Sequence, residues 1–244
     1  MTEYNNTPVA LITGASKGLG FTLASFLAAQ GYNLIINARD AHQLAETRDS
    51  LLSQGGTVRG ISGDVADPTS RERLVETVRP FSRLDLLINN ASTLGPLPML
   101  ALAAYPPKAM QRVFEVNTIA PLALVQELRP YLAAAGGLVV NISSDAATGG
   151  YEGWGGYGAS KAALDLLSAT LANELRDQNV GVVSVDPGDM RTDMHQDAFP
   201  GEDISDRPLP QVTLPFWAWL LGQKPLAVSG QRLQAQSELW QVAA

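Results

Sequence analysis

The sequence contains no cysteine, and it has only two histidines among its 244 residues. Without cysteine the chain can form no disulfide, no thiolate nucleophile and no cysteine-ligated zinc site. The histidines, His42 and His195, are too isolated in the sequence to indicate a metal site, although His195 could line a pocket. We therefore expect no bound metal.

Long apolar runs and clusters of basic residues are also missing. The longest apolar run near the end of the chain, residues 214–221, is too short to span a bilayer. Residues 1–6 are polar and lack the basic-then-apolar pattern of a signal peptide. The formal net charge of −7 argues against nucleic acid as a partner. We therefore expect a cytoplasmic protein that binds neither membranes nor nucleic acid.

Short apolar or β-branched runs alternate with longer helix-like segments along the chain. Strands are expected at 9–12, 33–37, 57–61, 84–88, 138–142, 180–185 and 227–233. Helices are expected at 18–30, 41–53, 68–78, 108–116, 118–134, 157–178 and 214–221. This alternation predicts an α/β fold, namely a Rossmann-type, doubly wound parallel sheet of about seven strands with helices on both faces.

No repeat or linker divides the chain, so we expect a single dinucleotide-binding and catalytic domain over residues 1–244. Residues 189–210 interrupt the alternation, because they are rich in Asp, Pro and Met and have little periodicity. A loop of that length inside a compact domain is usually functional. We therefore predict that residues 189–210 form a lid over a substrate.

A glycine-rich segment joins the first expected strand to the first expected helix. Gly14 would permit a tight turn, Gly18 would let the backbone approach a pyrophosphate, and Gly20 would allow the helix to pack closely on the strand. The free N–H groups at the start of that helix would bind an anion. The segment therefore predicts a phosphate-binding loop for a dinucleotide.

The Gly-x-x-x-Gly-x-Gly spacing resembles that of the classical short-chain dehydrogenase/reductase family, and later segments extend the resemblance over nearly the whole chain. Residues 89–92 read Asn-Asn-Ala-Ser, where the family usually ends in glycine, so Ser92 departs from it. The family places an acid near the adenine where this chain has Asp64, and it contacts the carboxamide where this chain has Pro187. The resemblance implies a nicotinamide cofactor contacted by Gly14, Ser16, Lys17, Gly18, Leu19, Gly20, Asp64, Val65, Asn90, Ala91, Pro187, Gly188 and Thr192.

The end of the second expected strand indicates which nicotinamide is used. NAD enzymes place a carboxylate there to bind the ribose 2′-hydroxyl, whereas this chain has Ala38 followed by Arg39. Arg39 would pair with a 2′-phosphate, and Lys17 would reach it from the glycine loop. Asp40 lies one residue further on, and we expect it to cap the following helix instead. These residues favour NADPH/NADP⁺ as the cofactor.

Tyr157 and Lys161 stand four residues apart in an expected helix, so their side chains lie on one face. A nearby ammonium group and the positive nicotinamide ring would lower the pKa of the tyrosine, which could then donate or accept a proton. A Tyr-x-x-x-Lys pair also occurs by chance on helix surfaces. The context favours the catalytic interpretation, because Ser144 ends the strand before this helix, thirteen positions upstream of Tyr157.

The family resemblance assigns roles to four residues. Ser144, rather than Ser143, would hold the substrate oxygen, and Tyr157 would act as general acid. Lys161 would also bind the nicotinamide ribose, and Asn117 would link the lysine to a water-mediated proton relay. Tyr157 and Lys161 thus belong to both the catalytic and the cofactor-binding set. The implied reaction is transfer of hydride from NADPH to a ketone or aldehyde.

The residues also indicate a substrate pocket. Its expected walls are Leu94, Tyr151, Trp154, Met190, Met194 and Phe199, which would suit an apolar or aromatic carbonyl compound. The same aromatic residues would equally suit core packing or an oligomer interface. Two other functions stay open: an NADP-sensing regulator without turnover, and an alcohol dehydrogenase that works in the oxidative direction. The resemblance further implies a homodimer or homotetramer.

Overall fold

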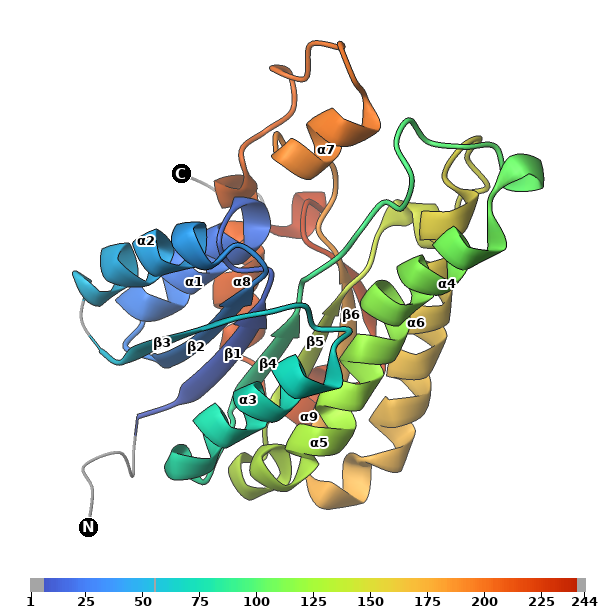
Figure 1. The fold of residues 1–244 in the computed structure, drawn as a ribbon. Coiled ribbons are helices and arrows are strands. Elements are labelled where there is room, and N and C mark those ends of the chain that lie inside the picture. Colours follow the sequence, from blue (N-terminus) through green and yellow to red (C-terminus); the bar gives the residue numbers. More distant parts are fainter. Residues whose placement is uncertain (1–6, 55, 241–244) are drawn as a thin grey trace.

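The computed structural model describes residues 7–54 and 56–240, so the prediction made for residues 1–6 lies outside it. Within these residues, seven parallel strands form one sheet in the order β3-β2-β1-β4-β5-β6-β7 (Figure 1). The strands are β1 (Val9–Thr13), β2 (Asn33–Ala38), β3 (Val58–Ser62), β4 (Leu86–Asn89), β5 (Leu138–Ile142), β6 (Gly181–Asp186) and β7 (Arg232–Gln234). The predicted Rossmann-type fold is confirmed.

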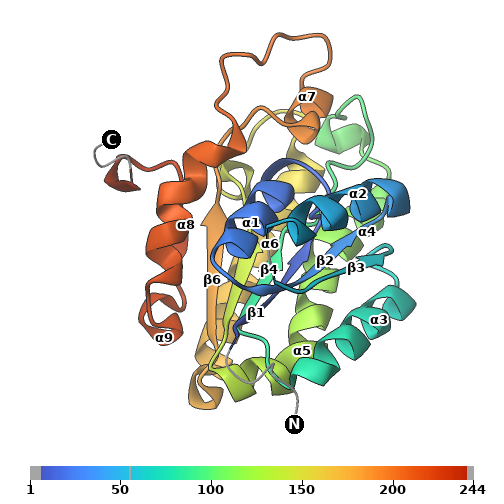
Figure 2. The same ribbon diagram turned by 90° about the vertical axis from the view of Figure 1, so that its left-hand side faces the viewer.

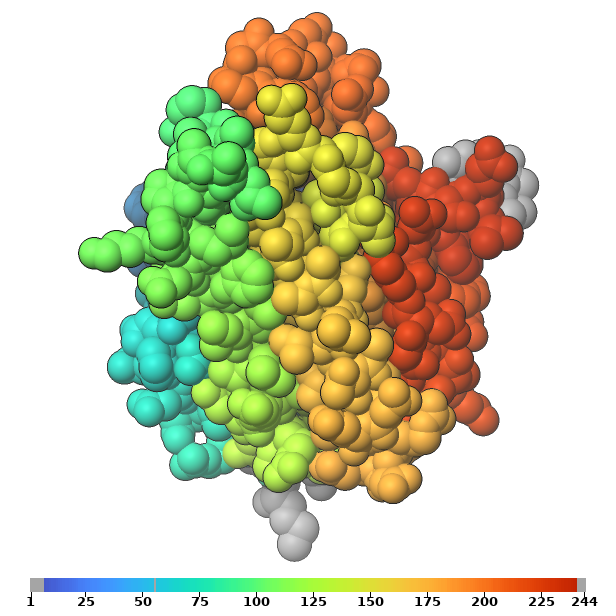
Figure 3. All heavy atoms as spheres, turned by 90° about the vertical axis from the view of Figure 1, so that its right-hand side faces the viewer, coloured from blue at the N-terminus to red at the C-terminus, as the bar shows by residue number. Residues whose placement is uncertain are grey.

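Helices cover both faces of this sheet (Figures 1 and 2). One face carries α1 (Gly18–Ala29), α2 (Ala41–Leu52) and α8 (Leu214–Leu221). The other carries α3 (Pro68–Val78), α4 (Pro107–Phe114), α5 (Ala120–Ala135) and α6 (Gly155–Glu174). Figure 3 shows α5 and α6 side by side on that second face. The sequence predicts two separate helices where α4 and α5 lie, but a π-helix, Glu115–Ile119, joins them without a break.

The two helix layers enclose two apolar cores, one on each side of the sheet. In β1, Ala10 and Ile12 pack into the first core, and Val9 and Leu11 pack into the second. This division follows from the alternation of side chains along a strand. Because both faces are covered, every residue of β1 is buried and the strand is continuously apolar.

Two segments differ from their predicted secondary structure. The strand expected at 227–233 is replaced in its first part by α9 (Pro225–Val228), and only the short β7 pairs with β6. Proline fixes the backbone angle needed at the start of a helix, which explains why α9 begins there. The loop expected at 189–210 contains α7 (Asp193–Ala198), whose N-terminus is capped by the Thr192 hydroxyl. Six residues are too few to produce a readable helical periodicity.

Candidate active site

A cavity of about 450 Å³ opens at the carboxyl ends of the parallel strands, where the strand order reverses between β1 and β4. Such a reversal is where open α/β sheets bind their ligands. The cavity brings together every predicted cofactor residue except Gly20, and also Ser144. Asn117, Tyr151 and Phe199 are not among its lining residues.

The glycine loop has the shape of a cradle in which added side chains would collide. Gly14 has a positive φ of 65°, and a Cβ there would lie 2.9 Å from Cα of Ala91. A Cβ on Gly20 would lie 2.2 Å from the Gly14 carbonyl oxygen, so Gly20 shapes the loop from behind the cavity. Asn90 holds the same turn, because its amide donates to the carbonyls of Thr13 at 2.9 Å and Gly14 at 3.0 Å.

The N-terminus of α1 faces this cradle. Lys17 stands at the helix N-cap and its side chain makes no capping hydrogen bond. The first N–H groups of α1 are therefore free of a side-chain partner and can bind an anion, assisted by the helix dipole. The loop, the helix end and the volume of the cavity fit a dinucleotide whose pyrophosphate rests on α1.

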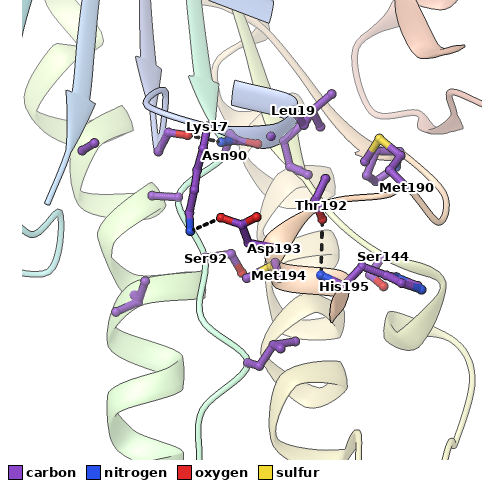
Figure 4. Close-up of a pocket in the computed structure, with 18 of the residues that line it drawn as sticks. Lys17, Leu19, Asn90, Ser92, Ser144, Met190, Thr192, Asp193, Met194 and His195 are labelled. Carbon is purple, nitrogen blue, oxygen red and sulfur yellow. Dashed lines mark hydrogen bonds and ion pairs between the residues drawn. The ribbon is translucent and has the colours of Figure 1, made fainter. Parts of the chain in front are cut away.

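The basic residues predicted to select NADPH lie at the end of the cavity near β2. Arg39 follows β2 and lines the cavity. Asp40 caps α2, because its carboxylate accepts from the backbone N–H groups of His42 at 2.9 Å and Gln43 at 3.0 Å, which confirms the predicted capping role. Lys17 points toward α7 instead, and its Nζ lies 2.7 Å from Oδ2 of Asp193 (Figure 4).

Asp64, the predicted adenine-side acid, lies beside the same end of the cavity. Its carboxylate accepts from the backbone N–H of Ala66 at 2.9 Å and forms an ion pair with Arg112. These contacts fix the turn after β3, where Val65 is buried against Val116 and Ala120. Asp64 therefore orders the loop that borders the cavity.

Tyr157 and Lys161 project from the first turns of α6 and are almost fully buried. Lys161 Nζ donates to the carbonyl oxygen of Ile142 at 2.7 Å and lies 5.5 Å from the centroid of the Tyr157 ring. Burial raises the pKa of Tyr157 to about 12, although hydrogen bonds from Ser144 and Ser92 lower it in part. Burial lowers the pKa of Lys161 to about 8.

The shift of the tyrosine is opposite to the one predicted from the Tyr-x-x-x-Lys pair. In the protein by itself, loss of hydration disfavours the phenolate more than the hydrogen bonds with Ser144 and Ser92 favour it. Tyr157 is therefore protonated at neutral pH.

Ser144 is held in place at the end of β5 by contacts from several elements. Its Oγ accepts from the backbone N–H of Ala146 at 3.1 Å and donates to Oδ1 of Asp145 at 3.0 Å. Its carbonyl oxygen accepts from Arg232 of β7 at 2.7 Å, and Arg232 also pairs with Asp186 at 3.2 Å. Its neighbour Ser143 lines the cavity as well, and the buried Oγ of Ser143 has no hydrogen-bond partner within the described residues.

Asn117 lies in the π-helix, fully buried behind the cavity. Its Oδ1 accepts from the backbone N–H of Thr93 at 2.9 Å and from Oγ of Ser92 at 3.1 Å. Its Nδ2 donates to the Thr93 carbonyl at 2.9 Å and to Oγ of Ser160 at 3.0 Å. The side chain of Asn117 thus ties the loop after β4 to α6, the helix that carries Tyr157.

The substrate side of the cavity is apolar. Leu94, Ala146 and Tyr157 form a small cluster, against which Trp154 and Met194 pack. The Trp154 ring stands edge-on to the Tyr157 ring, with 5.7 Å between the centroids. Met190 also lines the cavity.

The two remaining residues of the predicted pocket lie elsewhere. Phe199 forms an outer layer, because its ring packs on Trp154 at a centroid distance of 6.0 Å. Tyr151 is half exposed and projects from the loop before α6. The positions of these two side chains depend on how the segments before and after α6 pack on the rest of the protein. That packing cannot be predicted from the residue types alone.

Several lining residues are missing from the sequence-based set. They include Asn37, Gln43, Gly63, Asp145, Asp186 and Asp193, whereas His195 lines the cavity as the sequence analysis allowed. The acids among them follow strand ends or start α7, so their place beside the cavity depends on tertiary packing. Ser92, which departs from the family's glycine, also lines the cavity.

Comparison with known proteins places the fold and site in a family. A family model described as short chain dehydrogenase matches residues 8–203. The chain belongs to the short-chain dehydrogenase family. The resemblance carried by the glycine spacing and by Tyr157 and Lys161 is thus confirmed, and the protein is an oxidoreductase.

Relatives of this short-chain dehydrogenase cover most of its length. The oxidoreductase YciK of Escherichia coli K12 is 30% identical over 236 residues, or 95% of this chain and 92% of that protein. The rhamnolipids biosynthesis 3-oxoacyl-(acyl-carrier-protein) reductase of Pseudomonas aeruginosa is 35% identical over 188 residues, or 74% and 72% of the two chains. A solved short-chain dehydrogenase of E. coli CFT073 in complex with NADPH is 28% identical, with a TM-score of 0.87 and coverage of 97% and 100%.

Two further findings concern only residues 7–54 and 56–240. None of their helices has the length and apolar character needed to cross a bilayer. They also contain no group of three or more histidine, aspartate or glutamate side chains suited to hold a metal ion.

Proposed function

We propose that this short-chain dehydrogenase is an NADPH-dependent reductase of ketones and aldehydes. The observation that carries the proposal is the placement of a protonated, buried Tyr157 on the wall of the cavity that also contains the glycine cradle. A general acid and a dinucleotide site thus share one enclosed space. The apolar surface of Leu94, Trp154 and Met194 suits a substrate with an apolar or aromatic skeleton.

The choice of NADPH rests on the charges at the end of β2. No carboxylate stands at Ala38, and Arg39 and Lys17 offer two cations for a 2′-phosphate. Asp40 does not compete with the phosphate for this position, because its carboxylate is engaged in capping α2. Bound NADPH would supply the hydride, and the similar E. coli CFT073 protein was solved with that cofactor.

The chain's own residues would handle the oxygen and the proton. Tyr157 would donate its phenolic proton to the carbonyl oxygen as negative charge develops there. Ser144 would turn its hydroxyl from Asp145 to the same oxygen and share that charge. Lys161 would support the phenolate left behind, since an adjacent ammonium group stabilises it. Asn117 would hold the loop that follows β4 against helix α6. Ser92 on the loop and Tyr157 on the helix would thereby keep their relative positions.

The two alternative functions are less well supported. A regulator without turnover would not need Tyr157, Lys161 and Ser144 to converge beside the cofactor cradle. A dehydrogenase that oxidises an alcohol would need Tyr157 as a base. Arg39 and Lys17 fit NADP(H), which cells usually hold in its reduced form, and this favours reduction of a carbonyl.

Activity assays in both directions test the proposal. We expect the purified protein to oxidise NADPH in the presence of aromatic or apolar ketones and aldehydes, with lower efficiency for the matching alcohols and NADP⁺ at neutral pH. Absorbance of the reduced nicotinamide measures both reactions. NADPH binding without turnover of any carbonyl compound would support the regulator instead, and preferred oxidation of alcohols would support the dehydrogenase.

We also propose that residues 189–210 act as a lid. The base of the segment is closed, because the Arg191 N–H donates to the Pro208 carbonyl at 2.8 Å. It is anchored by Gln236, whose amide donates to the carbonyls of Pro187 at 3.0 Å and Asp189 at 2.8 Å. Helix α7 lies at the tip of this segment. Among the ion pairs of the described residues, only the exposed Lys17–Asp193 pair joins α7 to the glycine loop. Exposed pairs contribute little to stability, so this pair does little to hold α7 in place.

Hydrogen exchange measures this motion. We expect amides of residues 193–206 to exchange more slowly when NADPH and a competitive inhibitor are bound, because the ligands give α7 new contacts. Amides of β5 serve as the internal control, since that strand is buried in the sheet and should be protected in both states. Equal and strong protection of 193–206 with and without ligands would contradict a lid.

A further inference from the structure

His195, which lies in α7, has a role that neither the proposed proton transfer nor the cofactor site uses. Its imidazole lines the cavity, as do Ser144 and Met194 (Figure 4). The side chain is only 10% exposed, although it stands on the segment that covers the cavity. Both nitrogens of so deeply buried a ring should have hydrogen-bond partners, and a partner that the chain does not supply can come from a ligand.

His195 is held by one backbone contact and two contacts of its ring. Its backbone N–H donates to the Thr192 hydroxyl at 3.3 Å, which fixes the start of α7. Its ring packs on the Phe199 ring with 4.9 Å between centroids. Its Nδ1 lies 3.9 Å from Oδ1 of Asp189, so the carboxylate faces one edge of the imidazole. These contacts set the orientation of the ring within residues 189–199.

The other edge of the imidazole has no partner. The Nε2 atom is fully buried, and within the described part of the chain it makes no hydrogen bond. The Asp189 carboxylate beside Nδ1 favours the tautomer that carries its proton on Nδ1. In that tautomer Nε2 presents a lone pair, which accepts a hydrogen bond.

The surroundings define the chemistry of the missing partner. Asp189 faces the same imidazole and Asp145 lies beside Ser144, and both carboxylates oppose a negatively charged group there. The remaining surface beside Tyr157 is the apolar cluster with Leu94, Trp154 and Met194. The partner that satisfies Nε2 is therefore an uncharged donor on an otherwise apolar molecule, and a hydroxyl is the simplest such group.

We propose that His195 Nε2 accepts a hydrogen bond from a hydroxyl group of the substrate, which makes hydroxy-ketones and hydroxy-aldehydes with an apolar or aromatic skeleton the preferred substrate class. This inference rests on the proposed reductase function and narrows it. His195 is a specificity-determining residue, because it recognises a group remote from the carbonyl that reacts. A site built to bind a hydroxyl rejects the analogue that lacks it, since its own polar atom then stays unpaired.

Matched substrates test the inference. A phenolic aryl ketone is compared with its deoxy analogue and its methyl ether, which keep the skeleton but cannot donate. We expect wild type to favour the phenol by at least about tenfold in kcat/KM, the scale of one buried hydrogen bond. His195→Phe keeps an aromatic ring against Phe199 and removes Nε2, so the ratio should fall to about one. His195→Gln places an amide near the position of Nε2 and should retain part of the preference.

Nuclear magnetic resonance of wild type gives a readout independent of turnover and of the folding of a variant. The chain has only two histidines, and His42 is exposed with its side chain 86% accessible, so ¹⁵N-histidine labelling yields one probe and one internal reference. With the cofactor bound, the phenol should shift the Nε2 resonance of His195 and leave that of His42 unchanged. The methyl ether should produce no such shift.

The outcomes separate the two proposals. If both ketones are reduced with equal kcat/KM, or if saturating phenol leaves the Nε2 resonance of His195 unmoved, the assignment of His195 is wrong and the reductase function stands. If the phenol shifts Nε2 but no carbonyl compound is reduced, His195 is a ligand contact and the reductase function is wrong. Equal affinity for phenol and methyl ether, including no measurable affinity for either, also overturns the assignment.

Discussion

Replacing Tyr157 with phenylalanine should lower reductase turnover by at least about 10²-fold, the usual scale for loss of a positioned general acid. The ring, its edge-on contact with Trp154 and the apolar cluster with Leu94 are kept, so the variant should fold. Only the transferable proton is lost. The effect should appear in kcat, because the proton moves in the transition state and contributes little to ground-state binding.

Tyr151→Phe is the matched control for this variant. It removes the same hydroxyl from a tyrosine six positions earlier that is half exposed and outside the cavity lining. We expect its kcat to stay within about twofold of wild type, as is usual for exposed substitutions. NADPH binding, measured by fluorescence titration, should persist in both variants. A folded Tyr157→Phe protein with near-normal turnover would rule out Tyr157 as the acid.

Replacing Arg39 with aspartate should lower the NADPH:NADH preference by one to two orders of magnitude. The substitution removes a cation from the expected 2′-phosphate site and adds a carboxylate that can accept from a free 2′-hydroxyl. A charge-assisted hydrogen bond contributes about 1.5–3 kcal/mol, and each ~1.4 kcal/mol is tenfold in affinity. The change should appear mainly in KM for the cofactor, since the 2′-phosphate is remote from the hydride.

Lys17→Ala should act in the same direction but more weakly. A lysine is a mobile point charge without the rigid fork of arginine. The structure adds a second reason, because a 2′-phosphate must compete with Asp193 for Lys17.

A variant on α2, the helix that follows Arg39, controls for the change in net charge. Arg48→Asp makes the same charge change on this helix, but Arg48 pairs with Asp49 and is not among the residues that line the cavity. Its cofactor preference should match wild type in steady-state kinetics with each cofactor. A wild type that already prefers NADH, or an unchanged ratio in Arg39→Asp, would show that the end of β2 has been misinterpreted.

The parts of the site that could be predicted from sequence are those encoded by short segments. The glycine loop between β1 and α1 depends on neighbouring backbone angles, so its shape follows from residues 13–20. Tyr157 and Lys161 share a helix face because four residues span about one helical turn. The capping of α2 by Asp40 depends on N–H groups two and three positions later. Each of these features depends on residues that are close together in the sequence, and for this reason it could be predicted without the tertiary structure.

Other features depended on segments that meet only after folding. The pKa of Tyr157 rises to about 12 because the neighbouring elements exclude water. Lys17 lies against Asp193, although 176 positions separate them in the sequence. Asn117 joins the loop after β4 to α6, and the resemblance alone assigned it to a proton relay.

The sequence by itself determined the Rossmann-type sheet, the phosphate cradle and the order of the residues expected to react. These follow from apolar periodicity, from glycines at fixed spacing and from side chains one helical turn apart. The tertiary structure alone decided which groups are dehydrated, which charges pair across the cavity, and that His195 enters it with an unpartnered nitrogen. Burial and long-range pairing are properties of the assembled layers, because both depend on how much water the neighbouring elements exclude.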